Sequence, residues 1–91
     1  MFFKEFKVVA VSENTNSFGL RGFIAVARDG EAFQAAANSI NIPQKHAILR
    51  MPFLKDIDGN PTKKINYAVG GYEIPEKLDN WPANAVKKIW G

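Results

Sequence analysis

The sequence predicts a mostly β protein: a small antiparallel β-barrel or strongly twisted sheet of about five strands, with a short C-terminal helix. Its 91 residues suffice for one β-rich domain spanning 1–91, and a chain of this size has a thin core. Apolar segments rich in β-branched and aromatic residues alternate with turns rich in glycine, asparagine and aspartate. The chain lacks cysteine, so packing of its seven phenylalanines and other apolar residues must hold it together.

Residues 2–12 predict the first strand, because phenylalanine and valine dominate them and three of the valines fall within its second half. The polar residues 12–17 predict a loop, since Asn, Ser and Thr side chains offer hydrogen bonds that compete with a sheet. Gly19 and Gly22 then predict a bend or bulge at the start of the second strand.

The Asp29-Gly30 pair between two apolar segments predicts a β-hairpin, because a two-residue type I′ turn requires positive φ at both positions. This turn would place Arg28 opposite Glu31 and bring their opposite charges together. The same register places Val26 opposite Phe33 and Ile24 opposite Ala35. It therefore predicts that Ile24, Val26, Phe33 and Ala35 share one face of the sheet.

Residues 31–40 also fit an alternative α+β fold with a helix there. Phe33, Ala36, Ala37 and Ile40 follow the spacing of an amphipathic helix, and Glu, Ala and Gln are good helix formers. Isolated helices shorter than about 12 residues are marginal, which favours the hairpin. Both interpretations remain open from the sequence.

The rest of the chain predicts two further strands and a helix. Residues 46–54 and 62–69 are the strand candidates, separated by a turn, and residues 73–79 form an acidic loop. A helix starting near Pro82 should bury Ala85, Val86, Ile89 and Trp90 on one side, place Lys87 and Lys88 in its last turn, and end at Gly91.

No catalytic signature occurs, and we expect a binding module rather than an enzyme. His46 is the single histidine and cysteine is absent, so no zinc site, metal or cofactor is expected. Residues 56–67 resemble the start of a calcium loop, but Tyr67 stands where such a loop needs glutamate. Charged residues interrupt the apolar start, and no apolar stretch reaches the ~20 residues of a membrane span, which predicts a cytoplasmic protein without membrane association.

The net charge of +3 is mildly basic, and it permits an acidic partner. Lys63, Lys64 and Tyr67 lie close together, and Arg21 and Phe23 flank the bend before the second strand. Aromatic side chains that stack on bases beside cations that contact phosphates are typical of a groove for single-stranded DNA or RNA. In the alternative interpretation, the aromatic residues belong to the core and the lysines protect a sheet edge.

Gly22-Phe23-Ile24, Asp29-Gly30, Phe33 and Ile40 follow one another in the order typical of a cold-shock domain, so residues 21–40 resemble that family. The resemblance implies a five-stranded OB-like barrel that binds single-stranded nucleic acid, with Phe23 and Phe33 as stacking residues. A hairpin of an SH3-like barrel, without shared function, is the alternative. The candidate nucleic-acid-binding residues are Arg21, Phe23, Phe33, Lys63, Lys64 and Tyr67.

A protein–protein interaction or homo-oligomeric assembly domain is the second functional hypothesis. Trp81 and Trp90 flank the predicted C-terminal helix, and tryptophan is enriched at protein interfaces. The partner would be another protein or a second copy of the chain, bound through these tryptophans or an edge strand.

Overall fold

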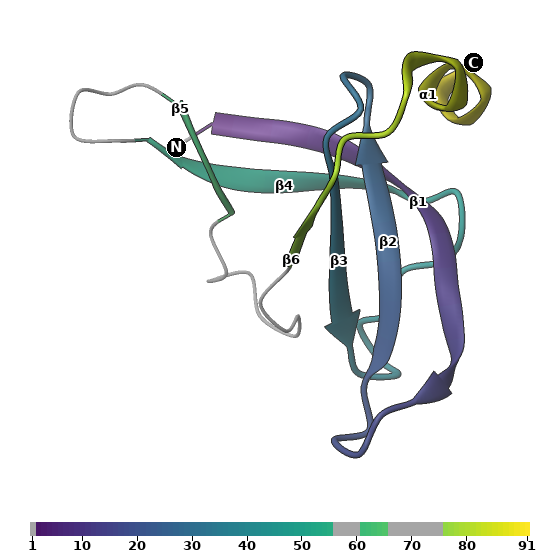
Figure 1. The fold of residues 1–91 in the computed structure, drawn as a ribbon. Helices are drawn as coiled ribbons and strands as arrows, with labels where there is room; N and C mark the ends of the chain where they lie inside the picture. The colour runs from purple at the N-terminus through teal and green to yellow at the C-terminus, as the bar shows by residue number, and fades with distance from the viewer. Residues whose placement is uncertain (1, 56–60, 66–75) are drawn as a thin grey trace.

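The computed structural model describes residues 2–55, 61–65 and 76–91 (Figure 1). Within these ranges it contains six strands and one helix. The strands are β1 (Phe2–Thr15), β2 (Arg21–Ala27), β3 (Ala32–Ala37), β4 (Ile48–Lys55), β5 (Pro61–Ile65) and β6 (Glu76–Leu78), and the helix is α1 (Ala83–Trp90). The predicted class, mostly β with a short C-terminal helix, is confirmed.

All described strands form one antiparallel sheet in the order β5-β4-β1-β2-β3-β6. No pairing between β5 and β6 is present among the described residues, so the sheet is open there rather than closed. It is strongly twisted: β4 and the first part of β1 cross β2 and β3 at a steep angle (Figure 1). The described strands thus form a strongly twisted, barrel-like sheet that is not closed.

Strand β1 is 14 residues long and serves both parts of the sheet. Its first half pairs with β4, and its pairing with β2 shifts register between Val8 and Ala10 and again between Val11 and Thr15. Such bulges bend a strand and increase its twist. The polar segment predicted as a loop from residue 12 therefore begins as strand, and the loop proper starts only after Thr15.

The hairpin at Asp29-Gly30 exists, but its predicted register is wrong by one residue. Gly30 N–H donates to Ala27 O (3.0 Å) and Ala27 N–H donates to Glu31 O (2.8 Å), which closes a three-residue loop. Gly30 has a φ of 91°, whereas Asp29 does not have positive φ, so a type I′ turn is not formed. Phe33 consequently pairs with Ala25 rather than with Val26.

This shift exchanges the faces of the hairpin, because side chains alternate along a strand. Phe33 lies on the same face as Phe23, and both are buried. Phe33 packs edge-to-face on Phe6 at 4.8 Å between ring centroids and on Phe23 at 6.0 Å. Alanines complete this face of the hairpin, and Val8 and Met51 join the cluster from β1 and β4.

The alternative helix over residues 31–40 is wrong, because residues 32–37 form strand β3 between β2 and β6. The alanines suit this central strand for a steric reason. Ala35 and Ala37 are buried beneath the strands that cross them, and small side chains leave room for the phenylalanine rings. Pairing on both sides outweighs the helical preference of alanine.

Helix α1 covers the other face of the sheet beside the 28–30 turn, and its predicted apolar side is confirmed (Figure 1). Val86 is buried against Val26 and Ala32, and Ile89 packs against the same cluster. Trp90 Nε1 donates to Val26 O at 3.0 Å. The helix starts after Pro82 without a side-chain cap, and Lys87 and Lys88 occupy its last turn as predicted.

The remaining elements differ from the predicted bounds. Strand β4 starts at Ile48 rather than at residue 46, because His46 has a φ of 75° and its N–H donates to Val8 O before the strand begins. Residues 76–78 were expected in a loop, but they pair with β3 as β6. In the described part of the chain, no helix has the length and apolarity needed to cross a bilayer.

Candidate functional site

The two phenylalanines predicted to stack on bases are buried. Phe23 is 2% exposed and Phe33 is 3% exposed. A ring must present a face to solvent to stack on a base, and these rings pack on one another within the core. The prediction that they bind nucleic acid is therefore wrong, and both belong to the core. The one-residue shift in the hairpin register places Phe33 on the same buried face as Phe23.

The other residues predicted for that groove are not brought together with them. The Arg21 Nε donates to Ser12 O at 2.8 Å, which ties the start of β2 to the end of β1. Lys63 and Lys64 lie in β5, separated from β2 by β4 and β1 in the sheet order. Tyr67 lies outside the described residues.

The two tryptophans predicted for an interface both have partners inside the molecule. Trp81 is half-buried, and its backbone N–H donates to Gly30 O at 2.8 Å. Trp90 is also half-buried, and the Arg28 guanidinium lies 4.1 Å from its ring centroid. Both side chains pack against the cluster that Val26, Ala32 and Val86 form between the hairpin and α1, while each keeps part of its surface exposed.

A different set of basic and aromatic residues converges between α1, β1 and the loop before β4. We name it the basic hollow; its volume is about 510 Å³. Lys7, Lys45, His46 and Lys88 supply its polar lining, and Trp81 and Ile89 its apolar walls. No carboxylate occurs among its described lining residues.

Three separate elements bring these cations together. Lys7 is on the α1-covered face of β1, and its Nζ donates to Ile89 O (3.0 Å) in the last helical turn. Lys45 and His46 follow β3 in the connection that pairs with Val8. Lys88 is on the exposed side of α1. Because these residues are far apart in the chain, the sequence held no local signal of this site beyond its net positive charge.

The cations on the neighbouring turn are neutralised, in contrast to those of the basic hollow. Lys4 forms ion pairs with Asp29 and Glu31, each at 2.5 Å, and Arg28 pairs with Glu5 at 3.2 Å. Partial burial disfavours the charged form of Lys4, but its hydrogen bonds to both carboxylates outweigh this and raise its pKa. Burial likewise opposes ionisation of Asp29, yet the bond from Lys4 lowers the pKa of that carboxyl group.

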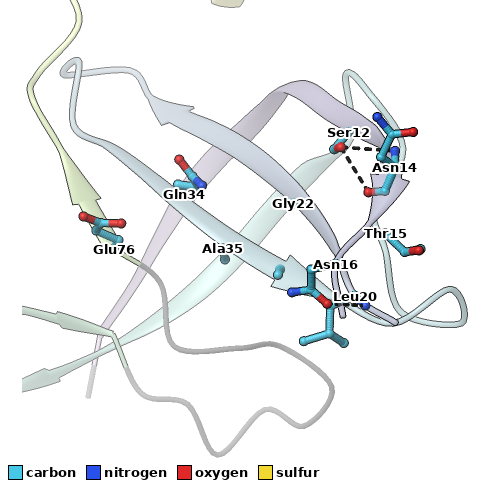
Figure 2. A pocket seen from close by; sticks show the side chains of 10 residues that line it. Ser12, Asn14, Thr15, Asn16, Leu20, Gly22, Gln34, Ala35 and Glu76 are labelled. Atoms are coloured by element: carbon cyan, nitrogen blue, oxygen red, sulfur yellow. Dashed lines mark hydrogen bonds between the residues drawn. The ribbon is translucent and has the colours of Figure 1, made fainter. Parts of the chain in front are cut away.

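A second concavity lies on the part of the same sheet face that α1 leaves uncovered. We name it the amide-lined hollow, and it has a volume of about 560 Å³. Figure 2 shows Asn14, Asn16, Gln34 and Glu76 around it. Its described lining also includes the small residues of β2 and β3, Gly22, Ala35 and Ala36, which leave space above the sheet.

The described lining of neither hollow supplies the ligands of a metal centre. Across residues 2–55, 61–65 and 76–91, no group of three or more His, Cys, Asp or Glu side chains is placed to hold an ion. Comparison with protein-family models, with curated proteins and with solved structures finds no significant match to this chain.

Proposed function

We propose that this protein is a non-enzymatic binding module that binds single-stranded DNA or RNA at the basic hollow. The observation that carries the proposal is the convergence of three lysines and a histidine on one hollow with a tryptophan wall. Cations contact phosphates and an aromatic face stacks on an unpaired base, which is the combination that single-stranded nucleic-acid sites use. The site thus differs from the groove first expected between β2 and β5.

The charge distribution supports this choice of surface. Within the described part of the chain, Lys7, Lys45 and Lys88 form no ion pair, whereas Lys4 and Arg28 do. Lysines without carboxylate partners are available to neutralise phosphates, which releases the cations condensed on the nucleic acid. Three lysines without carboxylate partners among the described residues therefore line one hollow beside α1.

The aromatic wall favours a single strand over a duplex. Trp81 is half-buried because it packs against the cluster of Val26, Ala32 and Val86, so only part of its surface can meet a ligand. A base can reach such a surface only when it is unstacked from its neighbours. The size of the hollow suits one nucleotide, since ligand sites of about 300–1,000 Å³ hold small molecules.

The test is titration of a fluorescently labelled single-stranded oligonucleotide with the full chain at several salt concentrations. We expect affinity to fall as salt rises, because phosphate contacts release counterions. The double variant Lys45→Gln and Lys88→Gln should bind at least tenfold more weakly. It should also lower the salt slope by about 1.4, since each phosphate contact to a single strand contributes about 0.7.

Lys77→Gln is the matched control, because Lys77 is exposed on β6 and does not line the basic hollow. It removes one positive charge, whereas the double variant removes two. Half of any general effect of net charge on affinity should therefore appear in it as well. No binding at micromolar protein, binding that ignores salt, or an equal loss per charge in Lys77→Gln would contradict the proposal.

A further inference from the structure

The two loops at the end of the sheet opposite α1 repeat one local structure. Asn-Ser-Phe occupies 16–18 and Asn-Ser-Ile occupies 38–40. The Asn16 Oδ1 accepts the N–H of Phe18 at 2.9 Å, and the Asn38 Oδ1 accepts the N–H of Ile40 at 3.1 Å. In each loop the asparagine side chain thus fixes a turn that presents a large apolar residue two positions later.

These two apolar residues are highly exposed. Phe18 is 80% exposed and Ile40 is 89% exposed. They lie at one end of the sheet, because Thr15 pairs with Arg21 and Arg21 pairs with Ala37, so the two loops leave neighbouring strand ends (Figure 1). We name Phe18 and Ile40 the apolar tip. Local hydrogen bonds hold both residues outward, so both are available for contact with a partner.

The apolar tip adjoins the amide-lined hollow. Asn16 and Leu20 of the first loop line this hollow, as do Ala35 and Ala36 of the strand that leads to Ile40. A second space of about 290 Å³ continues the hollow along β1 and β2, with Ala10 and Ile24 in its lining. The same end of the molecule therefore offers both a protruding apolar group and a concavity of sufficient size to accept one.

We propose that a second copy of this chain covers this end, in a two-fold dimer in which Phe18 of each copy enters the amide-lined hollow of the other. A two-fold axis repeats every contact, so a protrusion and a hollow that adjoin on one copy can be exchanged reciprocally. The protrusion and the hollow come from the same chain, and no other partner is needed to complete the fit.

The scarcity of charge at this end permits such a contact. Residues 14–20 and 38–44 contain no charged side chain, so the net charge of +3 does not oppose their approach. Glu76 is the charged residue in the described lining of the hollow, so two copies bring few like charges together there.

The size of the contact predicts a weak and reversible dimer. An aromatic side chain buries about 150–250 Å². Two phenylalanines, two isoleucines and the walls of two hollows together approach the lower end of specific interfaces, about 1,200 Å² in total. We therefore expect a dissociation constant in the micromolar range.

The experiment is sedimentation equilibrium of the full chain over a range of micromolar concentrations. We expect a monomer–dimer equilibrium, and Phe18→Ser should raise its dissociation constant at least tenfold. Ile48→Ser is the matched control, because Ile48 is also a large exposed apolar residue (51%) but lies in β4, away from the apolar tip. It should leave the equilibrium unchanged.

A second variant, Gly22→Val, tests the hollow rather than the protrusion. A Cβ at Gly22 would lie 3.8 Å from Ala35 O, an ordinary contact, so the strand can accept the side chain. Valine would occupy the floor of the hollow and should weaken the dimer at least tenfold, although it adds apolar surface. Circular dichroism checks that both variants fold. If Gly22→Val does not fold, the result with Phe18→Ser decides the test.

Three results would overturn the dimer. A monomer at every concentration would leave the apolar tip to the cleft of another protein or to a lipid surface. Association that Phe18→Ser retains would place the contact elsewhere on the chain. Growth beyond the dimer would indicate an open head-to-tail contact instead of a closed two-fold one.

Discussion

The two ends of strand β2 are built in different ways. At the end near α1, the 28–30 turn is held by residues far away in the chain: Lys4 pairs with Asp29 and Glu31, and Trp81 N–H donates to Gly30 O. At the opposite end, local hydrogen bonds hold the 16–20 loop, in which Asn16 Oδ1 accepts the N–H groups of Phe18 and Leu20.

This difference separates a region that stabilises the fold from one that can change without unfolding it. The 28–30 turn contributes to tertiary packing, because α1, β1 and the hairpin meet there. The 16–20 loop contributes little beyond its own geometry, and it leaves Phe18 in solvent. In a chain with a thin core, an exposed phenylalanine at such a place is available for binding.

The largest expected effect is that of Gly30→Ala, which breaks the tertiary end. Gly30 has a φ of 91°, and a Cβ there would lie 2.6 Å from Trp81 O, so both strain and a backbone clash arise. We expect a loss of about 3 kcal/mol or more in the free energy of unfolding, measured by urea denaturation.

Gly19→Ala is the control for the backbone conformation alone. Gly19 has a φ of 76°, and a Cβ there would meet nothing within 4 Å. The expected loss is about 1 kcal/mol. Equal losses in the two variants would mean that the close approach of Trp81 O to Gly30 adds no cost to the substitution.

Lys4→Met should have the next largest effect, about 1–2 kcal/mol, because it leaves the largely buried carboxylate of Glu31 without this cation. The effect depends on pH. The pKa of Asp29 is lowered in the folded protein, so its contribution is lost as pH falls through that value. The pKa of Lys4 is raised, so its contribution is lost as pH rises through it.

The difference in stability between the unmodified chain and Lys4→Met should therefore be largest near neutral pH and decrease toward both acid and alkaline pH. Urea denaturation of both proteins at a series of pH values measures it. A difference that stays constant from acid to alkaline pH would show that the methylene groups of Lys4, rather than its charge, stabilise the turn.

Asn16→Ala should cost about 1 kcal/mol, because it removes two hydrogen bonds from a solvent-exposed loop. The loop should then become mobile while the core is retained. Hydrogen exchange should show faster exchange at the N–H groups of Phe18 and Leu20 and unchanged exchange at Ala25 in the centre of β2. Faster exchange at Ala25 as well would mean that the loop does support the sheet.

Phe18→Ser should have the smallest effect on the stability of the monomer, within about 0.5 kcal/mol, because an exposed side chain loses few contacts on substitution. Thermal denaturation at low protein concentration, where a dimer is dissociated, measures it. A large loss there would mean that the ring packs on its own chain, and it would remove the contrast between the two ends.

The sequence predicted the first strand, the hairpin at Asp29-Gly30 and the apolar side of the C-terminal helix, because each depends on a local pattern. It did not predict the register of that hairpin. Asp-Gly fits either a two-residue turn or a three-residue loop in which Gly30 alone has positive φ. The structure has the three-residue loop, in which Gly30 packs against the backbone of Trp81. That choice decided that Phe33 belongs to the core.

The sequence predicted a site of cations beside aromatic residues, but at a different position from the basic hollow. A set of cations beside aromatic residues was expected around Phe23 and Lys63, whereas Lys7, Lys45 and Lys88 gather beside Trp81. Local proximity in the sequence could not reveal this, since the three lysines come from a strand, a connection and a helix. The apolar tip had a sequence signal, the repeated Asn-Ser-apolar motif, which acquires meaning only because the register brings both copies to one end.

The alternation of apolar residues and turns in the sequence by itself determined a mostly β fold with a terminal helix, because strand and helix periodicities are properties of neighbouring residues. The tertiary structure alone decided which face of each strand became core and which cations became neighbours. The physical reason is that a shift of one residue at a turn reverses every side chain beyond it, and only packing between distant segments selects one register over the other.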